Sequence, residues 1–174
     1  MTNDFSIKDM IKITLPDGAV REYEAGSSAF EVAKSISEGL AIKVLSVSIN
    51  GEVWDAHRPI DTDASLKLLT WDDADGKATF WHSSAHLMAE AVEGAFPGVK
   101  FWVGPAIDKG FYYDMDLGDQ KITEEDLVLL EKKMNELAKQ KNLFIRKPMP
   151  KAEAVQYFTE KGDEYKLDLL NNLT

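Results

Sequence analysis

The sequence lacks cysteine and contains few histidines, and both shortages limit the chemistry that it can support. Without a thiol, its 174 residues can form no disulfide, no cysteine–zinc site and no cysteine nucleophile. Imidazole groups are limited to His57, His82 and His86. Disulfide-stapled domains and cysteine-based zinc modules are therefore excluded within these residues.

Positive charge and long apolar runs are also scarce. The 20 lysines and arginines are outnumbered by 30 aspartates and glutamates, so the net charge is −10. This balance argues against a module held on nucleic acid mainly by a basic surface. No apolar run approaches the roughly 20 residues of a membrane helix, and the first five residues do not begin a secretory signal. We expect a cytoplasmic protein without a membrane partner.

Residues 10–71 carry the pattern of one small domain. An alternating apolar strand ends in an Asp-Gly turn at Asp17, which predicts a hairpin. Ser28 and Glu31 have the spacing of a capping box at a helix start, and Asn50 begins an Asn-Gly turn between two further strands. A hairpin, one helix and a second set of strands predict the α+β class, with a ubiquitin-like β-grasp.

Residues 72–174 have a different pattern and are expected to form a second, incomplete α+β domain. The acidic segment 72–77 marks the expected boundary. Helices are predicted over residues 80–96, after Thr123 and over residues 151–161.

The sequence also predicts short strands in this second domain and one helix with an apolar face. Strands are predicted over residues 101–103 and 111–114. The helix after Thr123 repeats apolar residues at helical spacing, namely Leu127, Leu130, Met134 and Leu137. From residue 163 onward no completed element is visible, so we expect the chain to be part of a longer protein.

His82 and His86 lie four residues apart on a predicted helix, so both rings are expected on one face. Two imidazoles in this arrangement can share a metal ion, or hold one water between a donor and an acceptor. The alternative is a polar pair without chemistry on the helix surface. A metal ion would need a third ligand, and the glutamate of an HExxH motif is missing, so we predict no metal site.

Three other positions, Gly104, Tyr113 and Lys166, could contribute to a ligand site. A glycine allows close approach of a ligand, a tyrosine offers a stacking face and a hydroxyl, and a lysine supplies a compact positive charge. On pattern alone, a plain hairpin with aromatic core residues and an ordinary surface lysine explain them more simply.

Three segments together resemble the N-terminal region of bacterial threonyl-tRNA synthetases. Residues 13–18 read ITLPDG, residues 82–87 read HSSAHL, and residues 104–114 read GPAIDKGFYYD. The first segment also occurs in other TGS domains, whereas the other two at this spacing are specific to the family. Residues 162–166, GDEYK, fit the same family in register, so the resemblance covers nearly the whole chain.

The resemblance implies a TGS domain at residues 10–71 and the first part of an editing domain at residues 72–174. The family joins threonine to tRNA(Thr) with ATP, and its editing domain hydrolyses seryl-tRNA(Thr) made in error. The family's editing histidines fall at His82 and His86, and its editing lysine falls at Lys166. These three are the implied catalytic residues.

The resemblance also implies binding residues, cofactors and partners. Tyr113 matches a pocket-lining tyrosine of the family, and we assign it to substrate binding together with Gly104. The family's site also uses a later Asp, Cys and His, and its synthetic core, with ATP, Mg and one zinc, lies outside these residues. We therefore expect no cofactor here, no aminoacylation, and little or no hydrolysis by this chain alone. The implied partner is tRNA(Thr) carrying a seryl or threonyl group, and the parent enzyme is expected to be a homodimer.

Two other classes of protein remain open. The first is a non-enzymatic TGS module that binds RNA or a protein partner; its binding would not change when His82 and His86 are replaced. The second is a free-standing aminoacyl-tRNA deacylase, which would need further metal or water ligands within the chain. Stoichiometric zinc would favour the second class.

Overall fold

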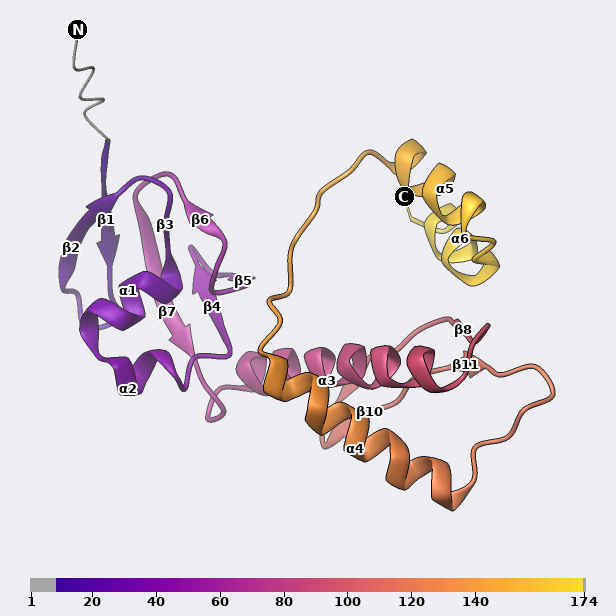
Figure 1. Ribbon diagram of the computed structural model, residues 1–174. Coiled ribbons are helices and arrows are strands. Elements are labelled where there is room, and N and C mark those ends of the chain that lie inside the picture. The colour runs from indigo at the N-terminus through magenta and orange to yellow at the C-terminus, as the bar shows by residue number, and fades with distance from the viewer. Residues whose placement is uncertain (1–8, 174) are drawn as a thin grey trace, which may run out of the picture. The chain divides into compact units, whose positions relative to one another are not determined.

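The computed structural model describes residues 9–173 and divides the chain into two compact units, Met1–Phe80 and Trp81–Thr174 (Figure 1). One helix, α3 (Ala74–Ala95), contributes residues to both units. It begins at Ala74 rather than at residue 80, so the prediction that residues 72–77 form a break is wrong. The domain bounds 10–71 and 72–174 stay a prediction.

Gly76, in that acidic segment, does not interrupt the helix but allows it to pack closely against the preceding strand. A Cβ atom at Gly76 would lie 2.0 Å from the Thr70 carbonyl oxygen, so only glycine lets the start of α3 pass this close to the preceding strand. Asp73 secures the same corner, because its Oδ2 accepts from Thr70 N at 2.9 Å and its Oδ1 lies 2.7 Å from Lys67 Nζ. The chain therefore turns directly from strand into helix.

The unit Met1–Phe80 is built on a mixed sheet of five strands in the order β2-β1-β7-β4-β5. The strands are β1 (Met10–Thr14), β2 (Val20–Glu24), β4 (Ser46–Ile49), β5 (Glu52–Trp54) and β7 (Ala64–Leu69). The central pair, β1 and β7, is parallel, and the other neighbours are antiparallel. The sheet is accompanied by α1 (Ala29–Ile36), α2 (Glu38–Ala41) and a short pair, β3 (Ser27–Ser28) with β6 (Pro59–Ile60). This confirms the predicted α+β, ubiquitin-like class.

The local signals in this unit act as the sequence indicates. Asn50 and Gly51 both have positive φ, 52° and 89°, which is the backbone of a tight turn between antiparallel strands. At the start of α1, Glu31 N donates to Ser28 Oγ at 3.3 Å and Ser28 N donates to Glu31 Oε2 at 2.7 Å. This completes the capping box and fixes where the helix begins.

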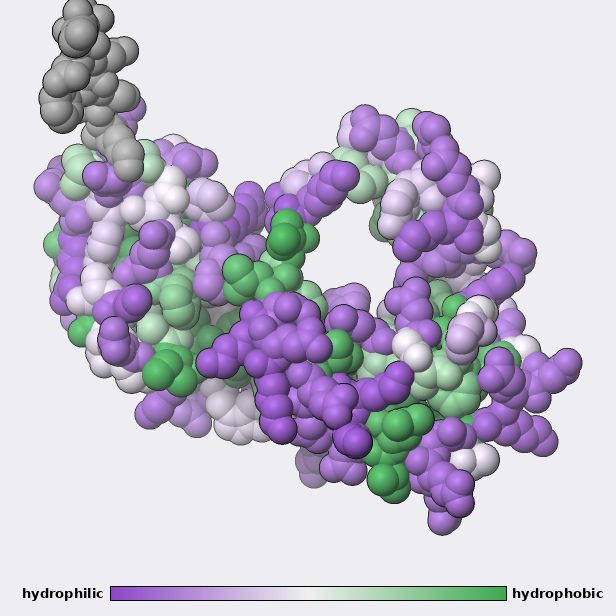
Figure 2. Space-filling model, in the orientation of Figure 1, coloured by the Kyte–Doolittle hydropathy of each residue, from purple (hydrophilic) through white to green (hydrophobic). Residues whose placement is uncertain are grey.

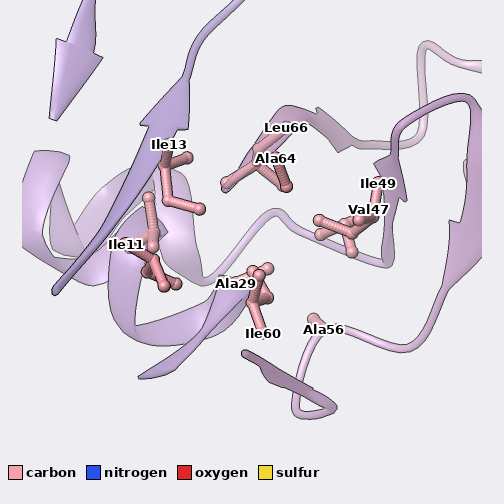
Figure 3. Close-up of a cluster of buried hydrophobic side chains, with 10 residues drawn as sticks. Ile11, Ile13, Ala29, Val47, Ile49, Ala56, Ile60, Ala64 and Leu66 are labelled. Carbon is pink, nitrogen blue, oxygen red and sulfur yellow. The ribbon is translucent and has the colours of Figure 1, made fainter. Parts of the chain in front are cut away.

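The core of the first unit lies on one face of the sheet. Ile13 and Val32 are fully buried, and Leu66 is only 2% exposed. Burial alternates along β1 and β7, as expected for strands with one covered face. Figure 3 shows the buried side chains of the strands gathered with Ala29, at the start of α1.

The unit Trp81–Thr174 combines helices with two short antiparallel strand pairs, one inserted in the chain between the strands of the other. Helix α3 packs against α4 (Glu124–Gln140) through a small core of Ala91, Val92, Phe96 and Leu130. The strand pairs are β8 (Lys100–Phe101) with β11 (Met115–Asp116) and β9 (Ala106–Ile107) with β10 (Gly110–Phe111). Two further helices follow, α5 (Lys151–Glu160) and α6 (Glu164–Asn171).

Four details of this unit differ from the sequence-based expectation. The strand expected over residues 111–114 does not form, because residues 112–114 connect β10, which ends at Phe111, to β11, which begins at Met115. The strand expected over residues 101–103 is limited to Lys100–Phe101, because Trp102 and Val103 both pair with the single residue Asp114 and interrupt the regular ladder. The segment expected to hold no completed element contains α6, which Asp163 caps by accepting from Lys166 N at 3.0 Å. Leu127 belongs to the predicted apolar stripe of α4 but is 57% exposed. Thr174 lies outside the described residues.

The segment between α4 and α5 carries apolar side chains on the surface. Leu143, Phe144 and Ile145 are 69%, 67% and 88% exposed, and Figure 2 shows apolar surface along this connection. Among the described residues, no helix is both long and apolar enough to cross a membrane.

Candidate functional site

The two histidines of α3 form a direct contact. His82 Nε2 and His86 Nε2 lie 3.1 Å apart, and the ring planes meet at 83°. The expected helical spacing therefore does bring both rings together. In this contact one Nε2 must carry a hydrogen and the other must accept it, because two protonated nitrogens would face each other with like charge. The two Nε2 atoms therefore satisfy each other, and the other ring nitrogens of the neutral pair remain as one acceptor, on the donating ring, and one donor, on the accepting ring.

Tyr113 and Gly104 form one wall of the site by close packing. The Tyr113 ring packs edge-on against Phe101, with 5.2 Å between centroids. A Cβ atom on Gly104 would lie 2.5 Å from Tyr113 Cδ2, so the ring lies directly against the glycine backbone. The glycine is needed for this approach, which gives the predicted binding residue a physical role.

Lys166 reaches the same region from the first turn of α6. Its Nζ atom donates to the Trp102 carbonyl oxygen at 2.7 Å and lies 6.0 Å from the centre of the Tyr113 ring. The Asp163 cap fixes the backbone of this turn. A residue far away in the sequence is thus placed beside the aromatic wall.

One hollow of about 490 Å³ contains all five predicted site residues. Its lining residues are His82, His86, Trp102, Val103, Gly104, Pro105, Tyr113 and Lys166. Sequence reasoning missed Trp102, Val103 and Pro105. The Gly-Pro pair after a short strand is a turn signal, but nothing in the pattern indicates that this turn lines a site.

The environment of the hollow lowers the pKa of two of its basic groups, His86 and Lys166. Partial burial, followed by the charges of His82 and Lys166, lowers the pKa of His86 below its ordinary value. Partial burial also lowers the pKa of Lys166, although the Asp163 carboxylate acts against this. Burial and then Asp163 raise the pKa of Tyr113, so its hydroxyl keeps its proton. A neutral imidazole is therefore available as a proton acceptor at neutral pH.

The lowered pKa of His86 predicts a pH effect on stability. Its folded-state pKa lies below the unfolded value of about 6.5, so the unfolded chain binds more protons between these two pKa values. The free energy of unfolding of unit Trp81–Thr174 is therefore expected to fall as the pH drops below about 6.5. Urea unfolding between pH 7.5 and 5.5 measures this, and His86→Gln should flatten the profile. An unchanged slope in that variant would contradict the assignment to His86.

The Gly104 packing predicts a loss in the Gly104→Ala variant. The added methyl group must displace the Tyr113 ring, and such overpacking costs about 1–3 kcal/mol of stability. Gly94→Ala is the matched control, because its Cβ would meet only Lys133 Nζ, at 3.5 Å, and alanine favours the helix by up to about 1 kcal/mol. Chemical denaturation of both variants compares them. Equal stability for the two would mean that the ring does not need the glycine.

Metal binding was not predicted for this site, and the geometry gives no ligand set for one. Within residues 9–173, no group of three or more His, Cys, Asp or Glu side chains is arranged to hold a metal ion. The expectation that these residues bind no cofactor stays a prediction.

Comparison with known proteins shows what the chain is similar to. Residues 11–70 match the TGS domain. The chain is 59% identical over 165 residues to a threonine–tRNA ligase of Cytophaga hutchinsonii, and 95% of the chain and 26% of that protein are covered. Threonine–tRNA ligases of Porphyromonas gingivalis and Parabacteroides distasonis are 54% and 53% identical, each over 94% of the chain and 25% of their own length.

The matches decide between the classes that the sequence left open. The chain spans about a quarter of the length of the curated relatives it matches. They carry the name of a ligase rather than that of a free-standing deacylase or a binding module. Nearly the whole chain is therefore similar to one region of threonine–tRNA ligases, and residues 11–70 of it match the TGS domain.

Proposed function

We propose that the hollow around His82 and His86 hydrolyses the ester of seryl-tRNA(Thr) within a threonine–tRNA ligase. The observation that supports this most is the convergence of His82, His86, Tyr113 and Lys166, from three separate segments, on one hollow of about 490 Å³. An imidazole can accept a proton from the attacking water, and an ammonium group can stabilise the negative charge that develops on the carbonyl oxygen, so these groups suit ester hydrolysis. The rest of the site comes from later residues of the ligase.

The imidazole pair and Lys166 have separate roles in the proposed reaction. A water molecule attacks the ester carbonyl carbon, and a ring nitrogen of the pair that is not engaged in the direct contact takes its proton. The ring that takes this proton can then donate a charge-assisted hydrogen bond to its neutral partner across the 3.1 Å contact between the two Nε2 atoms. The Lys166 ammonium polarises the carbonyl oxygen, and the protonated imidazole then gives its proton to the leaving oxygen as the ester bond breaks, which releases serine and the tRNA hydroxyl.

The proposed substrate follows from the limits of a synthetic site. Serine lacks one methyl group of threonine, and a pocket that selects the larger amino acid rejects the smaller by only about 10–200-fold. A second site that admits serine and excludes the extra methyl restores fidelity. The Tyr113 ring packs directly against Gly104 and supplies a rigid wall that can exclude the methyl group of threonine.

Charge distinguishes this hollow from the other large one in the same unit. A hollow of about 470 Å³ between α3 and α4 is lined by Glu90, Glu93 and Glu136, with a single lysine, Lys133. Three carboxylates repel a polyanion such as tRNA. The histidine hollow has Lys166 and no carboxylate in its lining, which suits the charged end of a tRNA.

The activity of the whole protein is part of the same proposal. It joins threonine to tRNA(Thr) with ATP, it uses Mg and one zinc in a part outside these residues, and it acts as a homodimer. In this chain the TGS domain and the histidine hollow serve tRNA(Thr) and its seryl group.

The experiment is a comparison of seryl-tRNA(Thr) and threonyl-tRNA(Thr) in a full-length ligase that carries this sequence. The seryl ester should disappear at least about 10-fold faster than the threonyl ester, which is the scale of discrimination by one methyl group. Equal rates for the two esters would contradict the proposed specificity. This chain alone, assayed beside the ligase, is expected to show little or no hydrolysis.

A further inference from the structure

The candidate lysine is held by an irregularity in the pairing of β8 with β11. Trp102 N donates to Asp114 O at 2.9 Å, but Asp114 N donates to Val103 O at 2.8 Å. Two residues of one strand thus face one residue of the other, which is the pattern of a β-bulge. The bulge leaves the Trp102 carbonyl oxygen to accept from Lys166 Nζ at 2.7 Å.

Tyr165, the residue before Lys166, is fixed at both its hydroxyl and its ring. The hydroxyl donates to Asp116 Oδ2 at 3.1 Å. The ring stacks on Trp102, with centroids 6.3 Å apart and planes 28° apart. The same tryptophan therefore meets Tyr165 with its ring and Lys166 with its carbonyl oxygen.

A neighbouring ion pair adds little to this attachment. Glu164 Oε1 lies 3.4 Å from Lys100 Nζ, and the two side chains are 78% and 40% exposed. Exposed pairs of this kind contribute about 0–1 kcal/mol. Among the side-chain contacts of this turn with β8 and β11, those of Tyr165 and Lys166 therefore matter more than this ion pair.

We propose that Tyr165 and Asp116 position Lys166 in the histidine hollow, an inference that rests on the proposed function. Consecutive residues of a helix share one rigid backbone, so fixing Tyr165 fixes the direction in which Lys166 leaves α6. Tyr165 and Asp116 line a different hollow, of about 230 Å³, and do not line the histidine hollow. They act through Lys166 and do not touch the substrate.

The test is the pH profile of acetylation at Lys166, read by mass spectrometry of peptides from this chain after treatment with acetic anhydride. In Tyr165→Phe and in Asp116→Ala, the midpoint for Lys166 should rise toward that of an ordinary lysine, because its amine moves from a half-buried position into water. In Asp116→Asn, whose amide oxygen can still accept from Tyr165, the wild-type profile should return. Tyr112→Phe, at an exposed tyrosine, is the matched control and should change nothing.

A second lysine separates positioning from a general loosening of the unit. Lys133, on α4, donates from Nζ to the Gly94 carbonyl oxygen of α3 at 3.0 Å. The pH profile of its acetylation should stay unchanged in every variant. An unchanged Lys166 midpoint in both Tyr165→Phe and Asp116→Ala would overturn the proposal, as would an equal shift at Lys133. The readout needs no hydrolysis. If Lys166 shifts as expected while Lys166→Ala leaves deacylation by the full-length ligase intact, the positioning stands and the proposed function fails.

Discussion

Replacing His86 with alanine is expected to slow the hydrolysis of seryl-tRNA(Thr) by the full-length ligase about 100-fold or more. His86 contributes one of the two Nε2 atoms in the 3.1 Å contact, and its lowered pKa keeps it ready to accept a proton. Alanine removes that acceptor and leaves His82 without its partner. The first-order decay of the seryl ester at saturating enzyme measures the effect on the chemical step.

The control for this variant is another histidine of the same chain. His57 lies exposed in the first unit, with its ring 4.8 Å from Phe30, and does not line the hollow. His57→Ala should hydrolyse the seryl ester at the wild-type rate. A His86→Ala enzyme that retains the wild-type rate would remove the imidazole pair from the mechanism.

Replacing Leu66 with alanine is expected to destabilise the first unit by about 2–5 kcal/mol. Leu66 lies on β7 and is 2% exposed, so the truncated side chain leaves a cavity in the core of the sheet. The loss is comparable to a large part of the stability of a small domain. Urea unfolding monitored by the amide signals of β1 and β7 measures this unit separately from the other.

An exposed aliphatic residue provides the comparison for Leu66. Ile42 is 83% exposed, and Ile42→Ala should change the unfolding free energy by less than about 0.5 kcal/mol. If both variants lost the same stability, burial would not be what sets the cost. Equal losses would therefore contradict the core assignment.

The first unit was predictable because its signals are local. The capping box of Ser28 and Glu31 and the turn at Asn50 each act within a few residues, and the structure contains both. The pairing of β1 with β7 joins distant segments, but the order of elements already favours it. The sequence did not predict the short elements β3, β6 and α2, because such elements depend on tertiary contacts rather than on periodicity.

The second unit was less predictable because its site depends on long-range contacts. Helical spacing predicted that His82 and His86 share a face. Nothing local brings Lys166 to Trp102, or Tyr165 to Asp116, because these contacts depend on where α6 packs. The resemblance to a known family indicated Lys166, whereas its hydrogen-bonding partners required the structure.

Pattern alone also misjudged two signals, one at the start of α3 and one on α4. Gly76 was interpreted as part of a break, but it allows α3 to start close to Thr70. The apolar stripe of α4 included Leu127, which faces solvent among the described residues. A glycine can permit close packing as well as a turn, and periodicity does not say where the opposing surface ends.

The most direct test of the account is binding of a hydrolysis-resistant amide analogue of seryl-adenosine to this chain, followed by amide and side-chain NMR. Binding needs no catalysis, so the test holds even though the chain alone is expected to hydrolyse little. We predict signal changes concentrated at His82, His86, Gly104, Tyr113 and Lys166, and weaker binding of the threonyl analogue. Changes confined to residues 10–71, or none at these five positions, would contradict the claim that this hollow is the site.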